Sequence, residues 1–444
     1  MMLKRIFSAV TEAAICLTIS SCGGSGNEQV PENTAETTAE GKKTINMTVM
    51  GKSIDTDFQL RIAEFNRTSE GYEIKVTDRG TDFSNVIDKL NLEIISGTTP
   101  DIVDGFFLPV ESYAEKGLLA DYYDFIDNDP EMCREDFLEN IFKACEINGG
   151  LYENITSFSI HTLIDRKSIA DEMQGRTSDD FIDLAERHPD KMLFNIQMYS
   201  HGLFDGFMRN GWQSFVDRET GKCDFNSERF IRILEFCSTF PDTFNYTMSD
   251  PNNEQSEQVL FNTDHNQIHN FYSLRKLERI FGEPPAVVGF PDAEGNGAII
   301  RANGSYIVFE NSPVKEGVWE FLRTDYLDEQ QNRIVTGDEY HTAGGSFPVR
   351  RSAIEFAMEE AKREVHQDYP GEYPDDFGTN TDEDNQKILD IINGAACRFQ
   401  ITENFVYDTI ITEEAGTYFS GQKSAKETAE IIQNRVQNYL DENR

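Results

Sequence analysis

The sequence predicts an α/β protein with more than one domain. Near the start of the chain, segments with the two-residue apolar period of strands alternate with segments that have the period of helices. This strand–helix–strand–helix–strand order within about sixty residues implies right-handed crossovers, and therefore a parallel sheet flanked by helices. The chain has 444 residues, which is more than one hydrophobic core organises, and this length indicates two domains.

The first predicted strand and helix follow from the spacing of their apolar residues. Residues 44–50, TINMTVM, alternate apolar and polar side chains as a strand with one buried face does. Residues 55–68 place Phe58, Ile62 and Phe65 on one face of a helix. Residue types that cap helix N-termini stand just before this face, so we expect a helix to begin there.

The next elements repeat the same alternation. Residues 72–77 form the second predicted strand, and the helix after it ends at Gly97, because glycine readily takes the left-handed conformation that terminates helices. Residues 101–103 predict a short third strand. The helix around residues 111–116 ends at Gly117 for the same reason as its predecessor.

The C-terminal segment predicts an amphipathic helix. Ala425, Ala429, Ile432, Val436 and Tyr439 fall at intervals of three and four residues, and charged residues occupy the other positions. We therefore expect this stripe to pack against the rest of the protein and to take no part in chemistry.

The first residues predict export from the cell. Residues 6–19 are mostly apolar, follow two basic residues, and have the length of a signal-peptide core, too short to span a bilayer. The sequence Ile19-Ser20-Ser21-Cys22 resembles the lipobox of bacterial lipoproteins, which implies removal of residues 1–21 and a lipid on Cys22. The alternative is an ordinary signal peptide in which Cys22 is incidental. Residues 22–43 contain almost no large apolar side chain and predict a flexible tether.

The amino-acid composition limits the kinds of molecule that the protein can bind. The formal net charge is −39, and such a surface repels nucleic acid and anionic lipid and favours a neutral or cationic ligand. The five cysteines after the leader contain no C-x-x-C pair, so they predict neither a disulfide framework nor a zinc site. Pairing of Cys133 with Cys145 or of Cys223 with Cys237 stays open, and buried free thiols, Cys397 included, are the favoured alternative.

Two loops at the carboxyl ends of the predicted strands are candidate ligand sites, because ligands bind at that edge of a parallel sheet. They are residues 51–55, after the first strand, and residues 104–109, after the third. The two phenylalanines of the second loop either pack in the hydrophobic core or stack against a ligand. The candidate residues in these loops are Ser53, Asp55, Asp104, Phe106 and Phe107.

The segment at residues 91–126, NLEIISGTTPDIVDGFFLPVESYAEKGLLADYYDFI, resembles the extracellular solute-binding proteins of ABC importers. This group includes maltose- and oligosaccharide-binding lipoproteins. The matching features are Ser96-Gly97 before Pro100-Asp101-Ile102, and Tyr113-Ala114 before Lys116-Gly117-Leu118-Leu119. Further segments resemble the family in the family's own order, and these are residues 148–169, 216–241, 288–297, 304–323, 344–355 and 410–442.

The resemblance implies an α/β fold of the two-lobed, type II periplasmic-binding-protein kind, with parallel-type sheets flanked by helices and lobes joined by hinge crossings. We expect hinge positions near Thr156–Ser157, Arg301 and Gly345. The domains implied are the signal peptide 1–21, the tether 22–43, the first lobe in two parts, 44–155 and 301–345, and the second lobe in two parts, 156–300 and 346–444, the last holding the C-terminal helices.

Further candidate ligand-binding residues lie in predicted loops and near the expected crossings. Sugar sites combine aromatic faces with groups that hydrogen-bond hydroxyls. Trp212 stands beside a glycine in a predicted loop, and the alternative for it is burial under the second lobe. The other candidates are Tyr199, Tyr272, Ser157, Ser305 and Phe347.

Motifs for catalysis and metal binding are missing from the sequence. There is no G-x-S-x-G elbow, and His265 and His269 have no H-E-x-x-H context. Residues 379–389, TNTDEDNQKIL, lack the central glycine of a calcium loop, so helix capping explains them better. We therefore expect no catalytic residue, no metal and no cofactor.

These observations favour a lipid-anchored protein on the extracellular face of the cell membrane. We expect it to be a monomer, to capture a small neutral ligand, most readily a carbohydrate, by hinge closure, and to deliver it to the transmembrane subunits of an ABC permease. Its membrane contact is the lipid on Cys22, and it binds no nucleic acid. The alternatives are a surface-anchored carbohydrate-active hydrolase, or a binding-protein fold used as a sensor or scaffold without transport.

Overall fold

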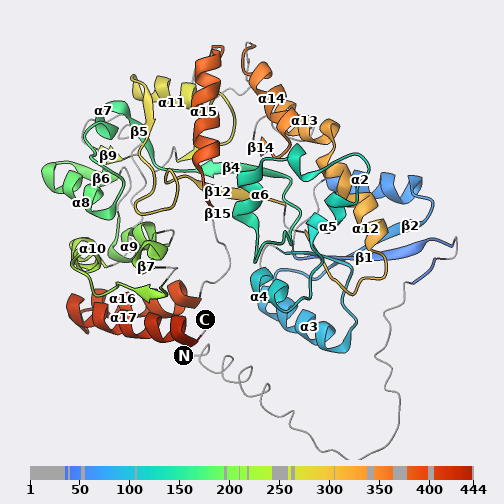
Figure 1. The fold of residues 1–444 in the computed structure, drawn as a ribbon, viewed down its shortest axis with the longest axis horizontal. Helices are drawn as coiled ribbons and strands as arrows, with labels where there is room; N and C mark the ends of the chain where they lie inside the picture. Colours follow the sequence, from blue (N-terminus) through green and yellow to red (C-terminus); the bar gives the residue numbers. More distant parts are fainter. Residues whose placement is uncertain are drawn as a thin grey trace, which may run out of the picture. The chain divides into compact units, whose positions relative to one another are not determined.

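The computed structural model of the chain shows strands and helices from residue 43 to residue 442 (Figure 1). All the described residues belong to one compact unit, residues 35–444. The predicted signal peptide and Cys22 lie outside the described residues. The structure describes residues 36–38, 41–51, 56–105, 108–194, 198–209, 211–217, 220–242, 259–261, 266–304, 306–337, 345–363, 378–398 and 405–442.

The first sheet has four strands in the order β13-β3-β1-β2. Strand β1 (Lys43–Val49) pairs in parallel with β2 (Tyr72–Asp78) on one side and with β3 (Ile102–Asp104) on the other. The predicted parallel sheet is therefore confirmed for its first three strands. The fourth strand, β13 (Tyr306–Val308), comes from much later in the chain and pairs antiparallel with β3.

The helices between these strands begin and end close to where their patterns predict. Helix α2 (Thr56–Thr68) buries Phe58, Ile62 and Phe65, the predicted apolar face. Helix α3 (Phe83–Ser96) ends at Gly97, whose backbone is left-handed, and α4 (Val110–Glu115) ends just before Gly117. The other helices packed in this part of the chain are α5 (Tyr122–Asp127), α6 (Glu139–Cys145), α12 (Lys315–Leu322), α13 (Asp328–Thr336) and α14 (Arg351–Glu360).

The second sheet is built around β4 (Ser157–His161) and β12 (Ile299–Asn303), which pair antiparallel over five residues. Strands β10 (Gln267–Ile268) and β14 (Phe347–Pro348) both pair antiparallel with β4. Strand β15 (Cys397–Arg398) pairs in parallel with β12. Segments from five separate parts of the sequence therefore meet in this sheet (Figure 1).

Three two-stranded pairings and a set of helices make up the remainder. The pairings are β5 (Ile164–Arg166) with β11 (Pro285–Val287), β6 (Met192–Phe194) with β9 (Val259–Phe261), and β7 (Val216–Asp217) with β8 (Lys222–Cys223). The helices are α7 (Lys167–Ala170), α8 (Ser178–Arg187), α9 (Ser200–Met208), α10 (Glu228–Ser238), α11 (Ser273–Phe281), α15 (Asp382–Gly394), α16 (Thr412–Phe419) and α17 (Ala425–Glu442).

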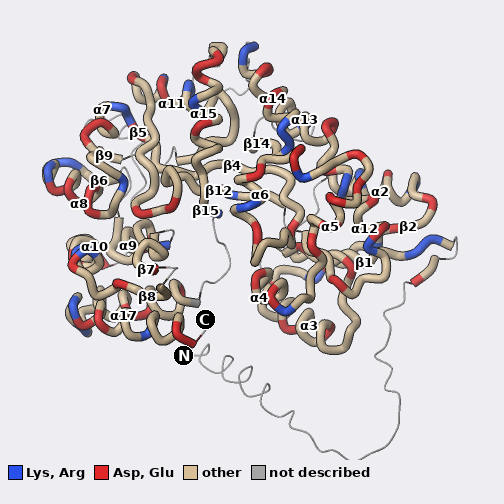
Figure 2. Tube along the Cα trace, viewed as in Figure 1, with Lys and Arg blue, Asp and Glu red and all other residues tan. Residues whose placement is uncertain are grey.

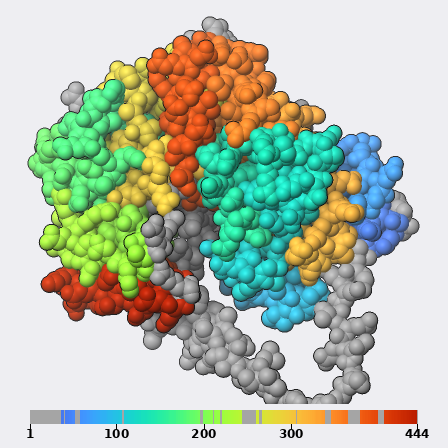
Figure 3. All heavy atoms as spheres, in the orientation of Figure 1, coloured from blue at the N-terminus to red at the C-terminus, as the bar shows by residue number. Residues whose placement is uncertain are grey.

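The C-terminal helix packs as its apolar stripe predicts. In α17, Ala425, Ala429, Ile432 and Val436 are buried, and Tyr439 is partly buried against the same apolar cluster. The helix contacts α10 and α16, and Figure 3 shows it (red) as an outer layer beside the light-green α10 region. The apolar stripe therefore packs this helix against the rest of the protein, as predicted.

Two further predictions are settled within the described residues. Cys133, Cys145, Cys223 and Cys237 are all free thiols, so neither of the two open pairings forms, and all but Cys133 are buried. Thr381 and Asp384 form a reciprocal capping box at the start of α15, which confirms helix capping for residues 379–389.

Charged residues are distributed along the whole described chain. Figure 2 shows Asp and Glu positions (red) on helices throughout it, with Lys and Arg positions (blue) interspersed among them. None of the helices in the described ranges is both long enough and apolar enough to cross a bilayer.

Candidate ligand-binding site

The second sheet has one apolar face and one polar face. Side chains alternate between the two faces along each strand, and residues directly opposite each other across a strand pair share a face. On one face, Phe158, Ile160 and Ile300 are fully buried in the largest apolar cluster. This cluster fixes the register of β4 and β12, because a slip of one residue would turn these side chains toward the other face.

The polar face carries side chains from three strands. Its polar members are Ser157, Ser159 and His161 of β4, Arg301 and Asn303 of β12, and Gln267 of β10. Two apolar residues share the face, Ile299 opposite His161 and Pro348 opposite Ser157. The pairing places Arg301 directly opposite Ser159 and Asn303 directly opposite Ser157. The Asn303 amide donates to the Ser157 hydroxyl at 3.3 Å, as expected for neighbours on one face.

Several polar groups on this face have unused hydrogen-bonding capacity. His161 Nε2 is buried and has no hydrogen-bond partner. Burial, together with the nearby charges of Arg301 and His269, lowers the pKa of His161, so its imidazole is neutral at pH 7. Ser159 is 2 % exposed, and its hydroxyl makes no hydrogen bond with any residue of the described ranges. Native proteins leave few buried polar atoms unpaired, so this face has the character of a binding surface.

The segment that enters β4 and the segment that leaves β12 are joined at the edge of this face. The Thr156 N–H donates to the Asn303 carbonyl at 3.0 Å, and the Tyr306 N–H donates to the Asn154 amide oxygen at 2.7 Å. Gly304 lies between them with a φ of +90°, and a Cβ there would lie 2.2 Å from the Asn154 carbonyl oxygen. Only glycine therefore allows these two backbones to approach this closely.

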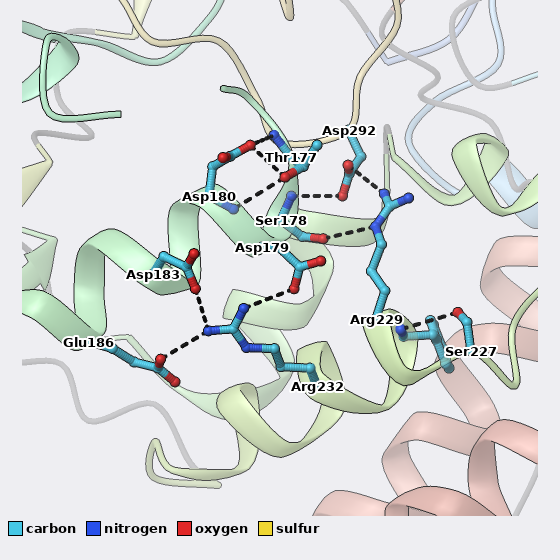
Figure 4. Close-up of polar contacts among 11 residues, drawn as sticks. Thr177, Ser178, Asp179, Asp180, Asp183, Glu186, Ser227, Arg229, Arg232 and Asp292 are labelled. Carbon is cyan, nitrogen blue, oxygen red and sulfur yellow. Dashed lines mark hydrogen bonds and ion pairs between the residues drawn. The ribbon is translucent and has the colours of Figure 1, made fainter. Parts of the chain in front are cut away.

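The turn that leads into β12 is held by a hydrogen bond to α8 and an ion pair to α10 (Figure 4). Asp292 accepts a hydrogen bond from the Ser178 N–H at the first turn of α8, at 3.1 Å, and forms an ion pair with Arg229 of α10. Arg232, also on α10, forms ion pairs with three carboxylates of α8. These ion pairs are exposed, so each adds little to the stability of the protein. Those carboxylates belong to Asp179, Asp183 and Glu186.

Two predicted polar candidates lie at strand ends. Ser157 is the first residue of β4 and stands on the polar face. Asp104 is the last residue of β3, is buried, and lies opposite Tyr306 of β13. The structure brings the two near the same chain segment, because Asn303 and Tyr306 are three residues apart.

The predicted aromatic candidates are distributed over different parts of the chain. Phe347 is 1 % exposed, and its ring packs against Phe158 and Phe271, with centroids 5.4 and 5.5 Å apart. Trp212 is 9 % exposed in a short 3-10 helix, within the apolar cluster of α8 to α10, and its indole N–H has no partner. Their roles as ligand contacts stay predictions.

The two tyrosine candidates precede helices. Tyr199 stands immediately before α9, half-buried, with its ring against Gly202. Tyr272 stands immediately before α11 and is also half-buried, next to Phe271, which packs on Phe347. The remaining candidates lie outside the described residues, and they are Ser53, Asp55, Phe106, Phe107 and Ser305.

Sequence reasoning missed most of the polar face. Ser159, His161, Asn303 and Gln267 were not among the candidates, and Arg301 was expected only as a hinge position. The signal was present in the alternation of residues 157–161, SFSIH, in which every second residue is polar. For metals, no cluster of ligating side chains occurs in the described ranges, and His265 lies outside them.

The sequence matches a family of binding proteins over most of its length. Residues 61–367 match the family described as bacterial extracellular solute-binding protein, and the chain belongs to that family. A solute-binding protein binds without catalysis, so the expectation of a non-enzyme is confirmed by the family. The family also places the protein outside the cell. Among curated proteins, no similar sequence was found.

Solved structures of sugar-binding proteins share the fold over most of both chains. One is the sugar-binding protein MalE of Xanthomonas citri, 14 % identical, with a TM-score of 0.56, covering 90 % of this chain and 98 % of that one. Another, from Listeria monocytogenes in complex with cycloalternan, is 14 % identical, with a TM-score of 0.53 and coverages of 90 % and 99 %. A third, from Thermotoga lettingae and bound with α-D-tagatose, is 16 % identical, with a TM-score of 0.52 and coverages of 89 % and 99 %.

These likenesses establish the α/β periplasmic-binding-protein fold predicted from the sequence. At such low sequence identity they show the fold alone, and they do not identify the ligand of this protein. The sheets of this chain are mixed: parallel pairing dominates the first sheet, and antiparallel pairing dominates the second.

Proposed function

We propose that this protein captures a carbohydrate outside the cell and delivers it to the permease of an ABC importer. The observation that carries the proposal is the polar face of the second sheet, where Ser159, His161 and Asn303 offer hydroxyl, imidazole and amide groups. Groups of this kind hydrogen-bond sugar hydroxyls. The sugars named for the solved structures of the same fold support a carbohydrate as the ligand class.

Hinge closure is the proposed mechanism. The chain passes between the proposed lobes near Thr156–Ser157, near Arg301 and near Gly345, with boundaries at residues 155/156, 300/301 and 345/346. Ligand held by one lobe recruits the other, and it shifts the equilibrium only by its differential affinity for the closed state. The permease then recognises the closed form.

The proposed anchor is a lipid on Cys22, with residues 22–43 as tether. A lipid chain stabilises membrane association by about 0.8 kcal/mol per buried CH₂. A Cys22→Ser variant, expressed in the native host, should appear in the culture medium instead of the membrane fraction. Equal membrane retention of the variant and the parent protein would exclude this anchor.

A thermal-shift panel of oligosaccharides, polyols and peptides, with analysis of products, tests the proposed function. A ligand at 100 times its Kd should add about 2.7 kcal/mol to the free energy of unfolding. We expect a shift with sugars and no product. Product formation would instead indicate a surface hydrolase. A shift with no member of the panel would reject carbohydrate capture and favour a sensor or scaffold role.

A further inference from the structure

Arg301 stands out among the described arginines because no carboxylate or carbonyl of the described residues pairs with it. Arginines elsewhere in the described ranges pair with carboxylates or donate to backbone carbonyls, and examples are Arg61, Arg79, Arg166, Arg323, Arg350 and Arg398. Within those ranges, only Arg279 and Arg301 lack such a partner. Arg279 lies in the last turn of α11, where the helix carbonyls favour a cation. Arg301 lies in a strand and has no such explanation.

The surroundings of Arg301 are also incompletely bonded. Across the strand pair stands Ser159, whose hydroxyl has no partner among the described residues. His161, two positions further along the same face, keeps its buried Nε2 unpaired and is close enough for Arg301 to lower its pKa. Three adjacent positions on one face therefore present donors or acceptors that an incoming molecule could complete.

The local charge is opposite to that of the protein. The formal net charge of the chain is −39, yet the strand positions of this face contain one arginine and no carboxylate. The guanidinium group binds carboxylates with two parallel hydrogen bonds, a geometry that lysine and neutral side chains do not offer. One uncompensated cation balances one negative charge, and a strongly acidic protein disfavours a more highly charged group such as a phosphate dianion.

Resting on the proposed function, we propose that the captured carbohydrate carries a carboxylate, as uronate-containing oligosaccharides do, and that Arg301 binds this group. Ser159, His161 and Asn303 then bind neighbouring hydroxyls of the same sugar. The net charge of the chain led us to expect a neutral ligand, whereas this proposal names an anionic one. The two differ because net charge is a property of the whole exterior, and the charge of Arg301 is a property of one face.

Matched pairs of ligands test the proposal by calorimetry on the purified protein. Each pair consists of the disaccharide of a uronate and the disaccharide of the matching neutral sugar. The three pairs compare galacturonate with galactose, glucuronate with glucose, and mannuronate with mannose. We expect one uronate to bind at least tenfold more tightly than its counterpart. The Arg301→Gln variant should weaken uronate binding roughly ten- to a hundredfold, since a charged hydrogen bond is lost, and should remove the preference.

Two variants control the experiment. Arg279→Gln removes the same charge from another unpartnered arginine and should leave uronate binding unchanged. Arg301→Lys keeps the charge and loses the planar fork, so it should bind between the parent protein and Arg301→Gln. Because Arg301 is exposed and unpaired, the melting temperature of Arg301→Gln without ligand should equal that of the parent protein.

Three results would overturn the proposal. If neutral sugars bind and no uronate does, Arg301 is not a carboxylate site, although carbohydrate capture stands. The same conclusion follows if Arg301→Gln binds the uronate as tightly as the parent protein. If no sugar of either kind binds, the proposed function fails, and this inference fails with it.

Discussion

The Gln331 side chain donates a hydrogen bond to the carbonyl oxygen of Thr156, 2.9 Å away, at the segment that enters the second sheet. The same amide group donates to the Asp325 carbonyl at 2.8 Å. Its oxygen accepts from the N–H groups of Val349 and Arg350, at 2.9 and 3.1 Å. One fully buried side chain therefore connects three separate backbone segments and satisfies four of their polar groups.

Replacement of Gln331 by leucine should destabilise the protein strongly. The leucine leaves two carbonyls and two N–H groups unpaired in the interior, and each unpaired group costs about 1 kcal/mol or more. We expect a loss of at least about 3 kcal/mol in the free energy of unfolding, measured by urea denaturation. Gln330→Leu, one position earlier and only partly buried, is the matched control and should change stability by less than about 1 kcal/mol. Equal losses in the two variants would contradict this account.

Asp129 should make the stability of the protein sensitive to acid. Its carboxylate is 1 % exposed and accepts hydrogen bonds from Arg323 and from the Trp319 indole. Burial opposes its ionisation, but these bonds outweigh burial and lower the pKa of Asp129 below its ordinary value. The stabilisation from a lowered pKa is complete above the ordinary value of about 4 and is lost as the pH falls through the folded-state value.

Asp129→Asn should therefore be less stable than the parent protein at pH 7, by about 3 kcal/mol, and the difference should shrink as the pH falls below about 4. Melting temperatures across this range give the comparison. Glu131→Gln removes another carboxylate bonded to Arg323, but one that is 64 % exposed, and should cost little at any pH. A constant difference between Asp129→Asn and the parent protein would rule out this assignment.

The two tryptophans should respond differently to the same substitution. The Trp319 indole donates to Asp129 at 2.8 Å, whereas the Trp212 indole N–H has no partner. Trp319→Phe therefore removes a hydrogen bond and Trp212→Phe removes none, so the first variant should be less stable by about 1 kcal/mol more than the second. Denaturant titration of both variants measures the difference. A larger loss in Trp212→Phe would show that its N–H is bonded in solution.

Thiol accessibility should separate one cysteine from the others. Cys133 is an exposed free thiol, whereas Cys145 and Cys237 are buried, and burial raises the pKa of both of these thiols. We expect an aromatic disulfide reagent to modify Cys133 in the folded protein and to modify Cys145 and Cys237 only after unfolding. Mass spectrometry of peptides identifies the sites, and Cys133→Ser removes the expected fast reaction. Rapid modification of Cys237 in the native protein would be inconsistent with its burial.

The sequence predicted the local part of the fold well, because short-range patterns determine it. Apolar spacing located β1, α2, β2, α3 and β3, and the glycine at residue 97 located a helix end. The place of β13 in the first sheet was beyond this reasoning. Its partner, β3, lies about two hundred residues earlier, and pairing over that distance leaves no local periodicity.

The candidate site was predicted less well for two physical reasons. Five loop residues were selected because ligands bind near strand ends, and four of these five lie outside the described residues. The strand residues of the polar face were missed because alternating apolar and polar residues usually indicate a strand with one face in the core and one in solvent. The polar residues were therefore interpreted as solvent-exposed and not as ligand contacts. Gln331 was missed for a similar reason, since a glutamine in a helix normally indicates solvent exposure.

The position of β13 at the edge of the first sheet has a consequence for biosynthesis. Strand β3 is made early, and β13 follows about two hundred residues later, roughly 10 to 40 s at 5–20 residues per second. During this interval the backbone of β3 has no partner on that side, and an unpaired edge can associate with other chains. The order of the strands along the chain therefore means that the first sheet can be completed only after residues 306–308 have been made.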